Sequence, residues 1–179
     1  MEPAILFPAF GALLFAAFFV KFGVSPPLFL WLIFGSLLLL LSLIDCFQRR
    51  LPDGLLAAGV LNRLCFFFLT HEPAERLPGL LVCALSFSVP LLLLVLAMDR
   101  LLGKQTMGGG DIKLIFVLGL YFDQTQMLLL LFLACALALA GIIRDVVTGA
   151  GTKGARRFPF GPCLSMAAFF VALSGQPYI

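Results

Sequence analysis

Charged side chains are scarce in this chain. Asp, Glu, Lys and Arg make up 12% of its 179 residues, whereas 62% are hydrophobic, and the mean hydropathy is +1.13. Such a composition excludes a water-soluble globule, whose surface needs more charge. The sequence also lacks internal repeats, low-complexity tails and a hydrophilic domain. We therefore expect one integral-membrane domain over residues 1–179.

Metal ligands and paired cysteines are equally rare. His71 is the single histidine, and the cysteines are far apart, with no C-x-x-C pair. They are Cys46, Cys65, Cys83, Cys135 and Cys163. A zinc site or a disulfide framework needs such residues in clusters, so we expect no metal and no disulfides. The glycines of residues 148–154 lack the spacing of a phosphate-binding loop, so we expect no nucleotide or other cofactor.

Long hydrophobic runs, in contrast, are abundant and predict the fold. A run of about 18 or more apolar residues with few charges is typical of a transmembrane helix. The candidate runs are residues 4–20, 27–45, 54–69, 78–98, 112–122, 126–143 and 161–175. The first does not have the pattern of a signal peptide, because Met1-Glu2 carries no positive charge. The runs at 112–122 and 161–175 are short, so we expect an all-α transmembrane bundle of six or seven helices.

The positive charges are distributed unevenly over the expected loops. One side of the membrane collects Arg49, Arg50, Arg100, Lys104, Arg144, Lys153, Arg156 and Arg157, with Lys113 just inside the next helix. The other side has Lys21 and Arg76. Positively charged loops remain in the cytoplasm, so the first set marks the cytoplasmic side, where it can also contact membrane lipid. Because the net charge of +3 is spread over several loops, we expect no nucleic-acid partner.

Two aspartates lie at the cytoplasmic ends of apolar runs. Asp45 follows residues 37–44, and Asp111 directly follows three glycines at 108–110. Taken alone, Asp45 has an equally good interpretation as an interfacial charge paired with Arg49. For Asp111 we expect a function, because the glycines would let an extended peptide pass close to its carboxylate. Together the two aspartates predict acid–base hydrolysis at a membrane surface.

Two other polar positions have structural interpretations. Asp53 follows Pro52 and is predicted to be the N-cap of the helix 54–69, accepting free backbone N–H groups. Arg63 interrupts the same helix, where a charge costs about 3 kcal/mol, so it must face the bundle or a water-filled cleft. For Arg63 we favour a structural hydrogen bond to a helix end over a contact with a catalytic carboxylate or a substrate.

The chemistry expected of an aspartate pair can be stated in general terms. Two carboxylates that share one water cannot both ionise cheaply, because like charges repel and burial favours the neutral form. The ionised carboxylate takes a proton from water, which attacks a carbonyl, while the protonated one supports the carbonyl oxygen. The sequence leaves open which of Asp45 and Asp111 carries the proton.

The spacing of these residues resembles a known family. Asp45-x6-Pro52-Asp53, followed by Met107-Gly108-Gly109-Gly110-Asp111 and later by Phe158-Pro159-Phe160-Gly161-Pro162, is similar to the type IV prepilin peptidases. These are bacterial members of the G-x-G-D membrane aspartyl proteases. The resemblance covers about residues 27–175 and leaves residues 1–26 as an extra N-terminal helix.

The resemblance implies site residues and a substrate. It implies that Asp45 and Asp111 are the catalytic pair and that Gly108 and Gly110, with Gly109 between them, bind substrate. It implies a prepilin or pseudopilin precursor as the substrate, cut behind its cytoplasmic leader at the inner membrane of a bacterium. The cytoplasmic loop with two C-x-x-C pairs that larger family members carry before this region is missing, so we expect no N-methyltransferase activity.

A membrane carrier is the alternative, since intramembrane carboxylates also mark proton and ion pathways. A carrier would show polar residues in several helices and internal symmetry. Beyond Asn62 and Arg63 the sequence has neither, so we favour the peptidase.

Overall fold

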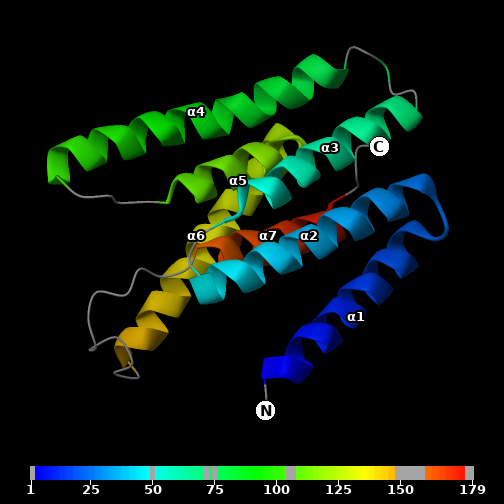
Figure 1. The fold of residues 1–179 in the computed structure, drawn as a ribbon, viewed down its shortest axis with the longest axis horizontal. Helices are drawn as coiled ribbons and strands as arrows, with labels where there is room; N and C mark the ends of the chain where they lie inside the picture. Colours follow the sequence, from blue (N-terminus) through cyan, green and yellow to red (C-terminus); the bar gives the residue numbers. More distant parts are fainter. Residues whose placement is uncertain are drawn as a thin grey trace.

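The described part of the chain is entirely helical. The computed structural model describes residues 3–48, 51–70, 73, 76–103, 108–147 and 160–175. Within these residues there is no strand, and the helices in order are α1 (Pro3–Phe22), α2 (Pro26–Gln48), α3 (Asp53–Leu69), α4 (Arg76–Leu102), α5 (Gly109–Gly119), α6 (Gln124–Val147) and α7 (Gly161–Ser174) (Figure 1). Each predicted run therefore corresponds to one helix, and the expected all-α bundle is confirmed.

Three of these helices are long and apolar enough to cross a membrane. They are α2, α4 and the part of α6 that covers Gln124–Arg144, with mean hydropathies of 2.5, 2.7 and 2.6. The remaining described helices are shorter or less apolar. The chain is thus a multi-pass membrane protein, although α5 and α7 are too short to cross a bilayer by themselves.

Successive helices run in opposite directions, so the end of one helix lies beside the start of the next (Figure 1). The C-terminal ends of α2, α4 and α6 lie at the same end as the N-terminal ends of α3, α5 and α7 (Figure 1). Glycines in the left-handed region end two of the helices: Gly23 has φ 58° after α1, and Gly103 has φ 62° after α4. Glycine adopts this conformation without the steric penalty of a Cβ.

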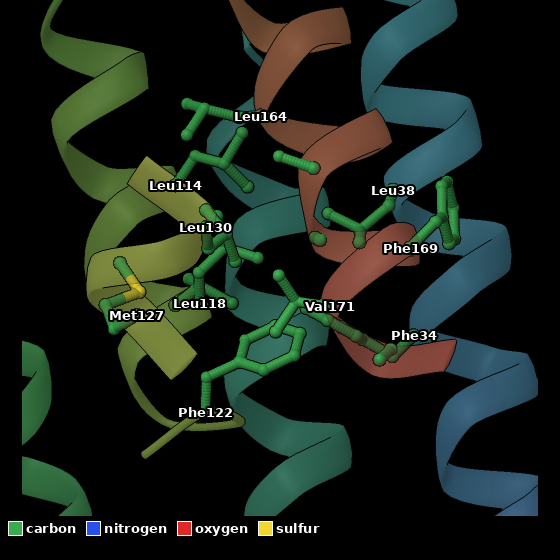
Figure 2. Close-up of a cluster of buried hydrophobic side chains, with 14 of the residues drawn as sticks. Phe34, Leu38, Leu114, Leu118, Phe122, Met127, Leu130, Leu164, Phe169 and Val171 are labelled. Atoms are coloured by element: carbon green, nitrogen blue, oxygen red, sulfur yellow. The ribbon is translucent and has the colours of Figure 1, made fainter. Parts of the chain in front are cut away.

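The two shortest helices occupy the centre of the bundle. Helix α5 packs against α3, α4, α6 and α7, while α7 packs against α1, α2, α5 and α6. Leu114 and Leu118 of α5 and Leu164 of α7 are completely buried. They point toward one another and toward Leu130 of α6 (Figure 2). An 11-residue helix is about 16 Å long, roughly half of a hydrocarbon core, so α5 alone does not cross it.

Small residues let the inner helices approach closely. A Cβ added to Gly119 of α5 would lie 2.5 Å from the Cα of Ala84 on α4, and one added to Gly59 of α3 would lie 3.1 Å from Val117. Close backbone contact at small residues is the usual way in which membrane helices associate.

Arg63 has the structural role that its position predicted. It is 6% exposed, and its Nε donates a hydrogen bond of 3.1 Å to the carbonyl of Leu120, which caps the C-terminus of α5. Beside it, the hydroxyl of Tyr121 donates to the carbonyl of Gly59 at 2.7 Å and accepts from Asn62 at 3.0 Å. This polar cluster lies at the end of the bundle away from Asp45 and Asp111.

Candidate active site

The structure places the two predicted aspartates at the same end of the bundle, on different helices. Asp45 lies in the last turn of α2, and its side chain is buried, with 6% exposed. Asp111 lies in the first turn of α5 and is partly buried. The antiparallel order of the helices brings these two positions together, although 65 residues lie between them in sequence.

The two carboxylates influence each other electrostatically. Asp111 belongs to the short helix α5 and lies outside the three membrane-crossing helices. Burial, followed by the negative charge of Asp45, raises the pKa of Asp111 to about 6 from its ordinary value of 3.8. This is the behaviour expected of two acids in one partly dry site, in which one keeps a proton more readily than it would in water.

Asp45 also has a partner that the sequence did not reveal. The backbone N–H of Gly161, the first residue of α7, donates to Oδ2 of Asp45 at 3.0 Å. A Cβ on Gly161 would lie 2.7 Å from the same oxygen, so only glycine fits without a shift. The sequence had marked Gly161 only as part of Phe158-Pro159-Phe160-Gly161-Pro162, of which Phe158 and Pro159 lie outside the described residues.

Two of the three glycines before Asp111 belong to helix α5. Helix α5 begins at Gly109, three residues earlier than the predicted run 112–122, and Gly108 is its N-cap in an extended conformation. A Cβ on Gly110 would lie 2.9 Å from the Cβ of Leu51, so this glycine makes room for the segment before α3. A Cβ on Gly109 would meet nothing within 4 Å, and one on Gly108 would lie 3.4 Å from Oδ2 of Asp111.

The prediction that Asp53 caps α3 is wrong. Pro52 occupies the N-cap position, and no side chain caps this helix end. Asp53 is the first helical residue, and its Oδ1 accepts a hydrogen bond of 2.6 Å from Nζ of Lys113 on α5. The carboxylate is drawn to the ammonium group because α5 brings Lys113 beside the start of α3. Both side chains are largely exposed, so this pair contributes about 0–1 kcal/mol.

An apolar cavity lies beside Asp111, between α3, α4 and α5. Its volume is about 500 Å³. Apart from Asp53, Ser88 and Lys113, its lining is apolar and consists of Leu56, Ala57, Val60, Val89, Leu92, Ile112, Phe116 and Val117. Because Ile112 and Lys113 directly follow Asp111, the cavity extends along α5 from the position of the carboxylate.

The charges at the two ends of the bundle agree with the predicted orientation. Arg100, Lys113 and Arg144 lie at the end that holds Asp45 and Asp111, whereas Lys21 and Arg76 lie at the opposite end. The rest of the predicted cytoplasmic set lies outside the described residues, namely Arg49, Arg50, Lys104, Lys153, Arg156 and Arg157. His71 and Met107 lie outside them as well.

Within the part of the chain that is described, no group of three or more His, Cys, Asp or Glu residues could hold a metal ion.

Comparison with known proteins places this geometry in a family. The model of the type IV leader peptidase family matches residues 32–143, which include both aspartates. The chain is 30% identical over 176 residues to a prepilin leader peptidase/N-methyltransferase of Bacillus subtilis (strain 168), covering 94% of this chain and 64% of that protein. It is 32% identical over 160 residues to the protein of the same name from Pseudomonas putida, covering 87% of this chain and 53% of that one.

A third relative agrees with these two. The prepilin leader peptidase/N-methyltransferase of Neisseria gonorrhoeae is 29% identical over 151 residues, covering 79% of this chain and 49% of that protein. The chain therefore spans between about half and two thirds of the length of these curated relatives. No solved structure gives a significant match.

Proposed function

Because the chain belongs to the type IV leader peptidase family, we propose that it is a membrane-embedded aspartyl endopeptidase. Its substrates are prepilin-like or pseudopilin precursors, from which it removes the cytoplasmic leader. The names of the three relatives support this activity, although each of those proteins extends beyond the region matched here.

The observation that carries the proposal is the pairing of Asp45 with Asp111. One is buried and the other partly buried, and burial, followed by the charge of the first, raises the pKa of the second. In the proposed reaction the ionised carboxylate removes a proton from water, and the resulting hydroxide attacks the scissile carbonyl. The protonated carboxyl group donates its proton to the carbonyl oxygen. The tetrahedral intermediate then collapses: the leaving amine takes the proton that the first carboxylate removed from water, and the protonated oxygen returns its proton to the second carboxylate as the carbonyl forms again.

The cavity between α3, α4 and α5 supports a substrate with an apolar helix. Its lining is almost entirely hydrophobic, and it runs along α5 away from Asp111. A precursor whose hydrophobic segment lies in this cavity would present the preceding peptide bonds to the aspartates. The leader would then extend toward the side of the membrane that carries Arg100, Lys113 and Arg144.

The three glycines remain substrate-binding residues in this proposal. Gly108 and Gly109 are exposed, and a Cβ added to Gly109 would meet no described atom within 4 Å. A peptide backbone can approach closely there because no Cβ intervenes. Gly110 acts indirectly, since its lack of a side chain allows Leu51 to pack beside the helix start.

The proposed location is the inner membrane of a bacterium, with the site at the cytoplasmic face. The distribution of positive charge supports this orientation. The same geometry argues against a carrier, because both carboxylates lie at one end of the bundle and not at mid-depth.

Cleavage in cells tests the proposal directly. The chain is co-expressed with a panel of tagged prepilin-like precursors, as wild type, Asp45→Asn or Asp111→Asn. The carboxamide is nearly isosteric but is neither an acid nor a base, so each variant should fold and lose activity by about 10²–10⁴-fold. Shortening of a precursor at its leader junction by wild type alone supports the proposal. Equal cleavage by both Asn variants would refute the assigned pair.

A further inference from the structure

We propose that the backbone N–H of Gly161 holds Asp45 in its ionised form, so that Asp45 is the general base of the pair and the proton resides on Asp111. The catalytic meaning of this assignment rests on the proposed peptidase function. The assignment of charge itself rests on the geometry around α7.

The hydrogen bond from the start of α7 favours a negative charge on Asp45. The N–H groups in the first turn of a helix have no partner within the helix, and they carry the positive end of the helix dipole. Gly161 directs one of these groups at Oδ2 of Asp45, at 3.0 Å and in a buried position. A donor that bonds a carboxylate favours the charged form, and the effect is larger where water is excluded.

Helix α7 has an ionisable side chain at each of its ends. At its C-terminal end, Nζ of Lys21 donates to the carbonyls of Ala172 at 2.6 Å, of Leu173 at 3.0 Å and of Gly175. A cation at the C-terminus and an anion at the N-terminus both stabilise a helix. An ionised Asp45 completes this pattern, whereas a neutral Asp45 would leave a buried helix start without its counter-charge.

Further contacts between α7 and α2 fix the register of the two helices and keep Gly161 beside Asp45. Oγ of Ser165, one turn beyond Gly161, donates to the carbonyl of Leu38 at 3.3 Å. A further turn along, Phe169 packs on Gly35, where a Cβ would lie 3.4 Å from its ring. The contacts advance along α7 as they recede along α2, so the two antiparallel helices are aligned over several turns.

Asp111 has a different environment. It also lies at a helix start, but Gly108 and Gly109 beside it are exposed, so water screens the dipole of α5 there. Among the described residues, no backbone N–H donates to its carboxylate, and the backbone N–H of Asp111 is itself bonded to the carbonyl of Gly108 at 3.1 Å. Burial penalises the charged form of both carboxyl groups, and more strongly that of Asp45. Among the described contacts only Asp45 accepts a backbone N–H that offsets this penalty, so the negative charge favours Asp45 and the proton favours Asp111.

The other ionisable groups at this end do not reverse the assignment. Among the described residues they include the thiols of Cys46 on α2 and Cys163 on α7, the Asp53–Lys113 pair of α3 and α5, Asp99 and Arg100 in the last turn of α4, and Arg144 near the end of α6. Free thiols are neutral near pH 7. Lys113 is bonded to Asp53, so its charge is largely compensated. Arg63 and Lys21 face the opposite end of the bundle.

A titration of the two carboxyl groups tests the assignment without using activity. The full chain is labelled with ¹³C at aspartate side-chain carboxyls, placed in lipid nanodiscs and followed by NMR from pH 3 to pH 9. The resonances are assigned by their loss in Asp45→Asn and Asp111→Asn. We expect the Asp45 resonance to titrate at the lower pH. The reverse order overturns the proposal, whether or not the chain is a peptidase.

Replacing one backbone atom tests the role of Gly161. Glycolic acid, introduced at position 161 by cell-free translation, converts the peptide N–H into an ester oxygen and adds no side chain. Without its donor, Asp45 should titrate about one pH unit or more higher, corresponding to roughly tenfold weaker retention of charge. The same ester at Gly54, an exposed position near the start of α3, should leave the Asp45 titration unchanged. An unchanged midpoint in the Gly161 ester would overturn the positioning role.

Cleavage by the same proteins separates the two proposals. If the wild-type chain cuts a precursor, the Gly161 ester should lower kcat about tenfold at low pH, with KM nearly unchanged. The pH at which activity is lost on the acid side of the rate profile should become higher. An ester that cuts with the wild-type profile overturns the positioning role and leaves the peptidase standing. A wild-type chain that cuts no precursor while the NMR order holds overturns the peptidase and leaves the charge assignment standing.

Discussion

Asp45 and Gly161 are hydrogen-bonded across 116 residues of sequence, at 3.0 Å between Oδ2 and the backbone nitrogen. This contact joins the last turn of α2 to the first turn of α7. It places a carboxylate at a helix N-terminus, where anions bind well. The chemistry proposed for the site therefore depends on α7 as well as on the two helices that carry the aspartates.

Gly161→Ala should reduce cleavage sharply. The new Cβ would lie 2.7 Å from Oδ2 of Asp45, so either the carboxylate or the start of α7 must shift. A displacement of this kind costs about 10²-fold in rate. The measurement is kcat and KM on a cleaved precursor. Gly54→Ala is the matched control, because a Cβ there meets nothing within 4 Å. Equal rates for the two variants would contradict the steric argument.

Stability and activity should both depend on the protonation of Asp111. Its pKa is raised to about 6 from 3.8, so between these values the folded chain holds a proton that the unfolded chain has released. The free energy of unfolding should therefore fall as pH rises through this window, and kcat/KM should fall above about pH 6. Thermal unfolding in detergent from pH 4 to pH 7 measures the first effect. In Asp111→Asn this pH dependence should be weaker, and an identical slope would show that another group causes it.

Ala57→Trp should block the cavity between α3, α4 and α5. Ala57 is exposed and lines this cavity, so an indole there would occupy much of its volume of about 500 Å³. We expect KM to rise roughly tenfold, which corresponds to about 1.4 kcal/mol of lost binding. Leu94→Trp on α4 is the control, because Leu94 is 59% exposed and does not line the cavity. If both variants cut equally well, the substrate helix does not lie there.

Gly119→Ala should loosen the contact between α4 and α5. The added Cβ would lie 2.5 Å from the backbone of Ala84, which is fully buried, so the two helices must separate. Overpacking of this kind costs about 1–3 kcal/mol of unfolding free energy. Denaturant unfolding of the purified protein measures the change. Gly79→Ala on the same helix pair serves as a control, since a Cβ there meets nothing within 4 Å. Equal stability of the two variants would mean that the bundle accommodates the methyl group.

Local signals in the sequence predicted the helices and most of their ends. Hydropathy and turn residues depend on neighbours in the chain, so the run 27–45 corresponds to α2 and the run 161–175 to α7. The same signals identified Asp45 and Asp111 as candidates, because each of these carboxylates lies at the end of a long apolar run. The structural role of Arg63 also followed, since a charge inside such a run needs a polar partner.

The signals misled where two local explanations competed. Asp53 has the right residue type for an N-cap, but Pro52 takes that position and Lys113 takes the carboxylate. The apolar run was predicted to begin at residue 112, yet Gly109 and Gly110 already belong to the helix. In both cases α5 decides the outcome by packing beside α3, and this packing has no local signature.

Composition and apolar runs, which are properties of the chain alone, were enough to predict the all-α membrane architecture and to single out Asp45 and Asp111 as candidate site residues. The central position of the two shortest helices and the contact of Gly161 with Asp45 became visible in the folded bundle. Those relationships join residues far apart in sequence, and they arise from close backbone packing and from the charge at helix ends. Neither cause is visible until the helices are assembled.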